Sequence, residues 1–404
     1  MKAALILWGS AAMILFAAPA FGQGLLALSG EGKSDYKENV PLTMSLNTGV
    51  GFDSIHYKDP SQQSTDSVFL QGGVGLIYQH NDHTTKFSVN GEFDTLYYFD
   101  EMVNGDHIFY NSHVGVNYSQ QINRRLSITD NFYLAYEMQP DYAIGATSTA
   151  SSGQYLYGYN NFAVSYAWSQ RFSTSTGYTI EGIHYNDSAV ADVDDRLSHT
   201  FSQVFSYRLN RKTTLVGEYR FELTNYKNGS STAQLGNPDY TAHYALVGVD
   251  QAWSPRLNAS ARAGAEFYLS DRGDRTEPYF ESSLTWAMSR TSSLRWYTQL
   301  GFDGSELGDY SARYSFRTGL MASRQFTERL TGNVSLNYVH SEFDGNDVVS
   351  SGSDNEVNAG IGVDYKLWRH VTLKANYSYT TISSDIDFRD YDRHYATLLL
   401  NATF

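Results

Sequence analysis

From Pro41 to Phe404, apolar residues alternate with small or polar residues in stretches of about 12 to 16 residues, which is the period of a β-strand. One of the clearest stretches is 257–268. Its odd-numbered positions are apolar and its even-numbered positions are mostly small, polar or charged: Leu257, Ala259, Ala261, Ala263, Ala265 and Phe267 against Asn258, Ser260, Arg262, Gly264, Glu266 and Tyr268. The pattern predicts long strands with one apolar face and one polar face.

The length of these stretches decides between two kinds of all-β protein. Strands of soluble sandwiches are about 5 to 6 residues long and turn their apolar face towards a core. A tilted strand that crosses a membrane needs about 9 to 11 residues and turns its apolar face outward to lipid. The sequence therefore predicts a transmembrane antiparallel β-barrel whose polar face lines a lumen.

The connections alternate between short turns and longer polar loops, as in outer-membrane barrels with periplasmic turns and external loops. Eight turns and nine loops give 17 connections, so we expect 18 strands, within a range of 16 to 18, and both termini in the periplasm. The turns are expected near 81–84, 121–125, 170–172, 209–212, 254–256, 289–292, 326–329 and 367–370, and the loops near 58–66, 100–106, 138–156, 186–195, 227–238, 270–274, 304–309, 344–353 and 383–388. An even number of strands permits closure, which leaves no unpaired edge in lipid.

Aromatic residues gather near the ends of the expected strands. Four tryptophans lie beside or within short turns, where an indole can sit at the periplasmic interface of the membrane: Trp168, Trp253, Trp286 and Trp368. Six tyrosines lie at the loop ends, and we expect them to form the outer girdle: Tyr57, Tyr98, Tyr185, Tyr226, Tyr240 and Tyr310.

The beginning of the chain has the features of a secretory signal peptide. Lys2 supplies one positive charge, an apolar stretch runs to Ala18, and small residues surround Ala20. We expect residues 1–22 to be removed, residues 23–40 to form a periplasmic segment and residues 41–404 to form the barrel. This organisation predicts a protein of the Gram-negative outer membrane.

Composition and charge narrow the classes of function. The chain has a net charge of −14, which makes nucleic acid an improbable partner on electrostatic grounds. It contains no Cys, which excludes a disulfide scaffold and thiolate chemistry. The mean hydropathy is −0.41 although the chain is long, so a thick apolar core does not organise it. We expect outer-membrane lipid to be the main environment of the barrel.

The end of the chain carries a specific local signal. The last expected strand finishes on an aromatic residue and presents an apolar face that leads up to it. This pattern looks like the terminal signal that the outer-membrane barrel assembly machinery reads, which makes this machinery an expected partner. The residues of the expected signal are Leu398, Leu400, Ala402 and Phe404.

The whole chain after residue 22, which is rich in Tyr and Asn, resembles the outer-membrane β-barrel porins of type 2. The stretch that carries the resemblance best is 390–393, Asp-Tyr-Asp-Arg, just before the last strand, where His394 replaces the Asn common in the family. The resemblance implies the barrel fold and a link to exopolysaccharide, because the family is often associated with exopolysaccharide gene clusters. It brings no catalytic residues.

Alternation also predicts which charged side chains face the lumen. Several of them stand at a similar depth in neighbouring strands and could form a belt of paired charges that lines a constriction. The same charges could instead only strengthen the wall of a water-filled lumen. The candidate belt comprises Glu218, Arg220, Glu222, Arg262, Glu266, Glu281, Arg295, Arg313 and Arg317.

Three tyrosines on adjacent strands also face inward, and their rings could stack on sugars as a saccharide track: Tyr268, Tyr279 and Tyr297. The chain shows no nucleophile with a base, and no metal or cofactor site is expected, so we do not expect an enzyme. Two functions stay open. One is a porin-like channel for small solutes or polysaccharide, and the other is a non-conducting structural, adhesive or assembly barrel. Segment 23–40 or loop 138–156 could plug the lumen.

Overall fold

The computed structural model describes residues 42–61, 64–101, 106–138, 153–227, 237–303, 310, 312–345, 350–387 and 389–404. The expected signal peptide and the segment 23–40 lie outside these residues, as does most of the loop 138–156. Among the described residues, no helix is long and apolar enough to cross a bilayer.

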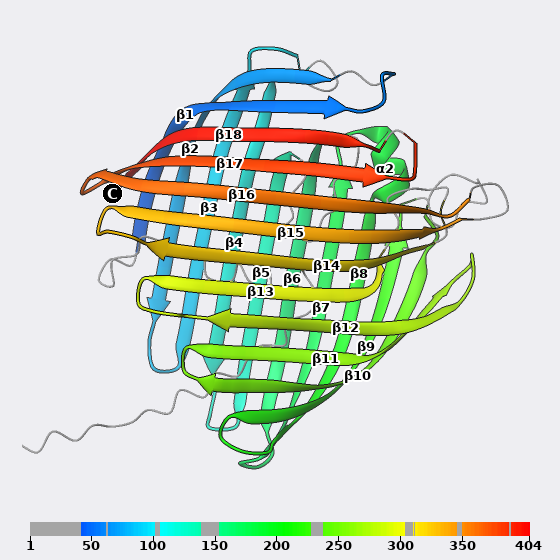
Figure 1. Ribbon diagram of the computed structural model, residues 1–404. Helices are drawn as coiled ribbons and strands as arrows, with labels where there is room; N and C mark the ends of the chain where they lie inside the picture. The colour runs from blue at the N-terminus through cyan, green and yellow to red at the C-terminus, as the bar shows by residue number, and fades with distance from the viewer. Residues whose placement is uncertain are drawn as a thin grey trace, which may run out of the picture.

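Eighteen antiparallel strands form one sheet, in which each strand pairs with the next along the chain and β1 pairs with β18. The last pairing closes the sheet into a barrel (Figure 1). The predicted transmembrane barrel and the count of 18 strands are confirmed. The strands are β1 Leu42–Tyr57, β2 Thr65–Asn81, β3 Thr85–Tyr98, β4 Ile108–Gln121, β5 Leu126–Met138, β6 Gln154–Ala167, β7 Phe172–Tyr185, β8 Arg196–Arg208, β9 Thr213–Tyr226, β10 Tyr240–Ser254, β11 Leu257–Ser270, β12 Arg275–Trp286, β13 Ser292–Asp303, β14 Ala312–Gln325, β15 Leu330–Asp344, β16 Gly352–Trp368, β17 Val371–Ser384 and β18 Tyr391–Thr403.

Short turns join the strands at one end of the barrel and longer loops join them at the other. The sequence did not predict that the loop after β7 contains a short helix, α2 (Ser188–Asp194), at the loop end (Figure 1). Seven of the eight short turns share a local device, in which a side-chain oxygen accepts backbone N–H groups two or three residues ahead. The residues that supply this oxygen are Asp82, Asn123, Ser169, Asn210, Ser254, Ser289 and Thr327.

In the first of these turns the accepting group is a carboxylate. Asp82 accepts from the backbone N–H of Thr84 at 2.7 Å and of Thr85 at 2.6 Å. The hydrogen bond from Thr84 is the main cause that lowers the pKa of Asp82 to about 2, because it stabilises the ionised carboxylate. At neutral pH Asp82 is therefore ionised and can accept both backbone hydrogen bonds.

The faces of the strands follow the alternation. On β15 and β16 the side chains of Leu336 and Ile361 are 47% and 55% exposed on the outside, whereas Asn337 is 3% exposed and points inward. The four turn-side tryptophans are exposed on the outer surface, between 41% for Trp286 and 71% for Trp368. An apolar outer face with indoles at one rim is the arrangement that a bilayer requires.

A test of the two faces uses Leu336 and its neighbour Ser335. Replacing Leu336 with Arg should lower the free energy of unfolding in lipid by about 2 to 4 kcal/mol, since the site lies near the middle of the apolar band. Ser335→Arg should cost much less, because Ser335 points inward on the same strand and is only partly buried. Urea titration of both variants folded in liposomes measures the difference, and equal losses would contradict the assigned faces.

The last residue takes part in the closure of the barrel. Phe404 N donates to Met44 O at 2.8 Å, and Met44 N donates to Phe404 O at 3.2 Å. Its side chain is 69% exposed on the outer surface, where Leu398 and Leu400 are also exposed and Ala402 is partly buried. The expected signal residues therefore share the lipid face of the strand that closes the barrel.

Deleting Phe404 should reduce the amount of assembled protein several-fold, because the deletion removes the two backbone hydrogen bonds to Met44 at the end of the β1–β18 ladder and the aromatic end of the signal. Unassembled protein should accumulate in the periplasm. Heat-modifiable band intensity in outer-membrane fractions measures this, with Phe404→Tyr as the control that keeps an aromatic ring. Equal surface levels for the deletion and the wild type would show that the terminal signal is not used.

Candidate functional site

The candidate belt lies on the inner wall formed by β9 to β14. The alternation of each strand points the predicted charges inward, and most of them are almost fully buried by their neighbours. Arg295 and Glu222 are only partly buried. The buried members are Glu218, Arg220, Arg262, Glu266, Glu281, Arg313 and Arg317.

Arg220 on β9 is the centre of the best-defined ion pairs. Its Nε donates to Oε1 of Glu218 at 2.5 Å, and its two Nη atoms donate to the carboxylate of Glu281 at 2.7 and 3.0 Å. The pair with Glu281 is bidentate, which is the strongest geometry for Arg and a carboxylate. Since Glu281 lies on β12, this contact joins strands that are not neighbours in the sheet.

Arg262 on β11 extends the network. Its Nε lies 3.6 Å from Oε2 of Glu218, and its Nη2 donates to Oδ1 of Asp250 at 2.7 Å. Asp250 was missed from the sequence, although the alternation of β10 would have placed it inward. Together, Glu218, Arg220, Arg262, Glu281 and Asp250 hold two positive and three negative charges on one patch of wall.

The other predicted charges have different surroundings. Glu222 accepts hydrogen bonds from the hydroxyls of Tyr240 at 2.9 Å and Tyr244 at 3.2 Å. Glu266 accepts from a backbone N–H of β13 at 3.0 Å. On β14, Nε of Arg317 lies 3.4 Å from a serine hydroxyl. The strand register places Arg262, Glu281 and Arg317 in one row across β11 to β14, which agrees with their similar expected depth.

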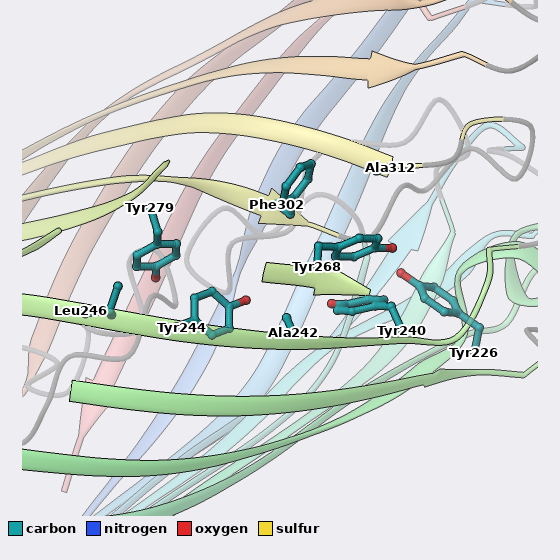
Figure 2. Packing of buried hydrophobic residues seen from close by; sticks show 9 residues of the cluster. All are labelled: Tyr226, Tyr240, Ala242, Tyr244, Leu246, Tyr268, Tyr279, Phe302 and Ala312. Carbon is teal, nitrogen blue, oxygen red and sulfur yellow. The ribbon is translucent and has the colours of Figure 1, made fainter. Parts of the chain in front are cut away.

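The three tyrosines of the expected saccharide track are packed into the wall. Tyr268 lies 4.6 Å from Tyr240 between ring centroids, and Tyr279 lies 5.1 Å from Tyr244 (Figure 2). Tyr279 also donates to Glu281 at 2.7 Å, and a Cβ at Gly319 would meet the ring of Tyr297. Their exposed fractions are 3%, 4% and 7%. This packing counts against a sugar track, because stacking on a sugar needs a free ring face.

The six tyrosines at the loop ends do not form the expected outer girdle. Tyr98, Tyr185, Tyr226, Tyr240 and Tyr310 are buried, and all but Tyr310, with the partly buried Tyr57, belong to three apolar clusters on the inner wall. The expectation was wrong because a preference for strand ends does not fix a face. Tyr226 is two residues after Thr224 and four after Glu222 on β9, so its side chain lies on the same inward face of the strand.

A second buried ion pair lies at the closure of the barrel and was also missed. Arg393 on β18 donates to both carboxylate oxygens of Asp53 on β1, at 2.8 and 2.7 Å, and the hydroxyl of Tyr98 donates to Asp53 at 3.1 Å. Another residue of the Asp-Tyr-Asp-Arg stretch also contacts β1: Tyr391 packs on Tyr57 with ring centroids 5.9 Å apart. The stretch helps to join the two ends of the barrel wall.

The closed wall, its apolar outer face and its polar inner face define a porin-like β-barrel of the outer membrane. The model of the family described as "Putative beta-barrel porin 2" matches residues 103–404, so the chain belongs to this family of porins. The resemblance drawn from the sequence is thereby confirmed. No curated protein sequence matches the chain.

Several solved structures are similar to the chain at low identity. OpdK from Pseudomonas aeruginosa has 11% identity and a TM-score of 0.46, with 90% of this chain and 99% of that chain covered. OccAB4 from Acinetobacter baumannii has 11% identity and a TM-score of 0.44, with coverages of 91% and 99%. A BenF-like porin from Pseudomonas fluorescens has 11% identity and a TM-score of 0.46, again with 91% and 99% covered. Nothing about solutes follows from likeness at this level.

Proposed function

We propose that the chain forms a channel for small hydrophilic solutes across the outer membrane. One observation carries the proposal: the wall is closed by 18 strands, and its inner face is polar. Barrels of about 16 to 18 strands are wide enough to leave an aqueous channel. The wall of such a channel must offer polar groups to solutes that shed part of their water.

The ion preference of this channel should be weak. Within the best-defined patch the three carboxylates exceed the two guanidinium groups by one charge only. At the mouth, Asp192 is paired with Lys227 at 3.0 Å and Asp344 with Arg275 at 2.9 Å, so exposed carboxylates there are partly compensated. Exposed charges act over about 10 Å in 0.1 M salt and about 3 Å in 1 M salt. Any preference that originates at the mouth should therefore fade as salt rises.

Planar-bilayer recording of the purified barrel tests the proposal. We expect open-channel conductance in KCl, and a reversal potential across a dilute KCl gradient that shows a small preference for cations and shrinks in concentrated KCl. Anion selectivity would contradict the proposal that carboxylates at the mouth of the barrel set the ion preference. A barrel that folds, shifts on heating and never conducts would refute the channel.

The solutes that we propose to test first are saccharides, because the resemblance implies a link to exopolysaccharide. Carboxylates on the inner wall that are only partly buried, such as that of Glu222, can exchange hydrogen bonds with sugar hydroxyls. Swelling of proteoliposomes in sugars of increasing length measures the largest one that enters. Swelling in KCl but in no sugar would support the channel and contradict the proposal that it takes saccharides.

The alternative is a non-conducting barrel at the cell surface. The three apolar clusters on the inner wall favour it, since they place bulky aromatic rings on the lumen side of several strands. Complete absence of conductance and of swelling, in protein that is folded, is the result that would select this alternative.

A further inference from the structure

The ladder between β12 and β13 is shorter than any other described ladder in the barrel. It contains seven residue pairs, from Phe280 with Leu300 to Trp286 with Leu294. Every other neighbouring pair of described strands has at least ten, and the next shortest is β4 with β5. Residues 275–279 of β12 and 301–303 of β13 are strand residues beyond the end of this ladder, towards the loops, where the two strands separate (Figure 1).

Side chains replace the missing ladder bonds. Pro278 has no N–H to give to β13, and a proline is tolerated in a strand where no partner needs that donor. Its carbonyl accepts instead from the hydroxyl of Tyr314 on β14, at 2.7 Å. The backbone N–H of Phe302 donates to the carboxylate of Glu266 on β11, at 3.0 Å. Two backbone groups that face the opening, the carbonyl of Pro278 and the N–H of Phe302, are therefore paired with side chains of β14 and β11.

The opening begins within the membrane. Trp286 marks the turn-side interface, and Phe280 lies six residues further along β12. Six residues rise about 20 Å along a strand, or about 16 Å along the membrane normal at a tilt of about 40°. Because the apolar band of such a barrel is about 25 Å tall, the ladder ends inside the half of the bilayer nearer the loops.

One aromatic side chain fills the opening. The ring of Phe302 lies 5.2 Å from Tyr268, which faces the lumen, and 5.2 Å from Tyr314, which faces lipid. Figure 2 shows Phe302 beside Tyr268 in the inner cluster. Tyr268, Phe302 and Tyr314 therefore form a continuous aromatic path through the wall, and only 7% of Phe302 is exposed.

We propose that the seam between β12 and β13 is a lateral port through which the acyl chain of an amphiphile passes between the lumen and the outer leaflet. Phe302 is its plug. The path is lined by aromatic faces that accept a slender hydrocarbon chain, and no backbone group has to break a ladder bond when the plug moves. The port does not depend on conduction along the axis of the barrel.

Fluorescence quenching by lipid tests the port. The chain contains no Cys, so a single Cys takes one bimane label without side reaction. Glu277→Cys places the label on the lumen side of the seam, since Glu277 lies opposite inward-facing Glu266 and is exposed. Ser282→Cys places it on the lipid face as the positive control. The quencher is 5-doxyl phosphatidylcholine in the liposomes that hold the protein.

We expect little quenching at position 277 in the parent and at least a twofold increase after Phe302→Ala. Phe302→Leu keeps a smaller apolar side chain in the opening and should give an intermediate value. It also keeps the test valid if the Ala variant does not fold. The matched control is Phe316→Ala on β14, which removes an outward Phe from a strand that is paired on both sides.

Equal quenching at position 277 in the parent and in the Phe302→Leu and Phe302→Ala variants, all as heat-modifiable barrels, would overturn the port. An equal rise in the Phe316→Ala control would overturn it as well, because loosened packing would then explain the result. KCl conductance of the same preparations is measured separately. If no preparation conducts KCl but quenching still rises when Phe302 is replaced, the axial channel is refuted and the lateral port stays in place.

Discussion

Replacing Asp53 with Ala should lower the free energy of unfolding of the barrel by about 3 to 5 kcal/mol, the usual loss when one partner of a buried ion pair is removed. Asp53 is fully buried and receives two hydrogen bonds from Arg393 and one from Tyr98. The variant leaves a guanidinium in the wall without its carboxylate. Since the pair joins β1 to β18, its removal weakens the contact between the two strands that close the barrel.

Urea titration of the barrel in liposomes, followed by the loss of the heat-modifiable form, measures the change. The matched control is Asp66→Ala on β2, because Asp66 is 55% exposed and faces a His at 3.1 Å near the loop end. An exposed pair of this kind contributes little to stability. If both variants had the same midpoint, the closure would not depend on the Asp53–Arg393 pair.

The sequence was sufficient for the barrel because the relevant signals repeat. Alternation over long stretches predicts strands, their faces and their number, and the polar turn residues such as Asp82 and Asn210 fix where each strand reverses. These signals are local in the sequence, so strands, faces and turns can be predicted from them without knowing how the sheet curves. The same locality explains why α2 was missed, since it lies inside one loop and has no repeat to reveal it.

The inner wall was predicted only in part, and the reason is geometric. Alternation placed Arg220 and Glu281 on the inner face, but their contact joins β9 to β12 across two intervening strands. Such contacts depend on the curvature of the closed wall and on side-chain length, which a single strand does not encode. The pair of Asp53 and Arg393 is separated by almost the whole chain and becomes visible only once the sheet is closed.

The ladder between β12 and β13 shows a different limit. Pro278 was visible in the sequence, and a proline in a strand ordinarily marks an edge or a bulge. The alternation of β12 nevertheless continues through Pro278, so the strand was predicted without interruption. Only the register shows that the partner of Pro278 on β13 is missing and that Phe302 takes up the space.

Replacing Arg220 with Gln should destabilise the barrel and strengthen its preference for cations. Glu218 is fully buried in its side chain and Glu281 is 11% exposed, so both carboxylates would lose their closest cation in a wall that water screens poorly. By the rule for a broken buried pair, the unfolding free energy should fall by about 3 to 5 kcal/mol. The wall would also carry one more net negative charge.

Arg220→Lys is the control that separates charge from geometry. Lys keeps the positive charge but cannot form the two parallel hydrogen bonds to Glu281, so it should lose stability and leave the reversal potential close to that of the wild type. A charge at the mouth would be screened in concentrated KCl, whereas one inside the lumen would not. The shift of reversal potential in Arg220→Gln should therefore persist at 1 M KCl. If the Gln and Lys variants lose similar stability and neither shifts the reversal potential at any salt concentration, the network holds the wall together without facing the ion path.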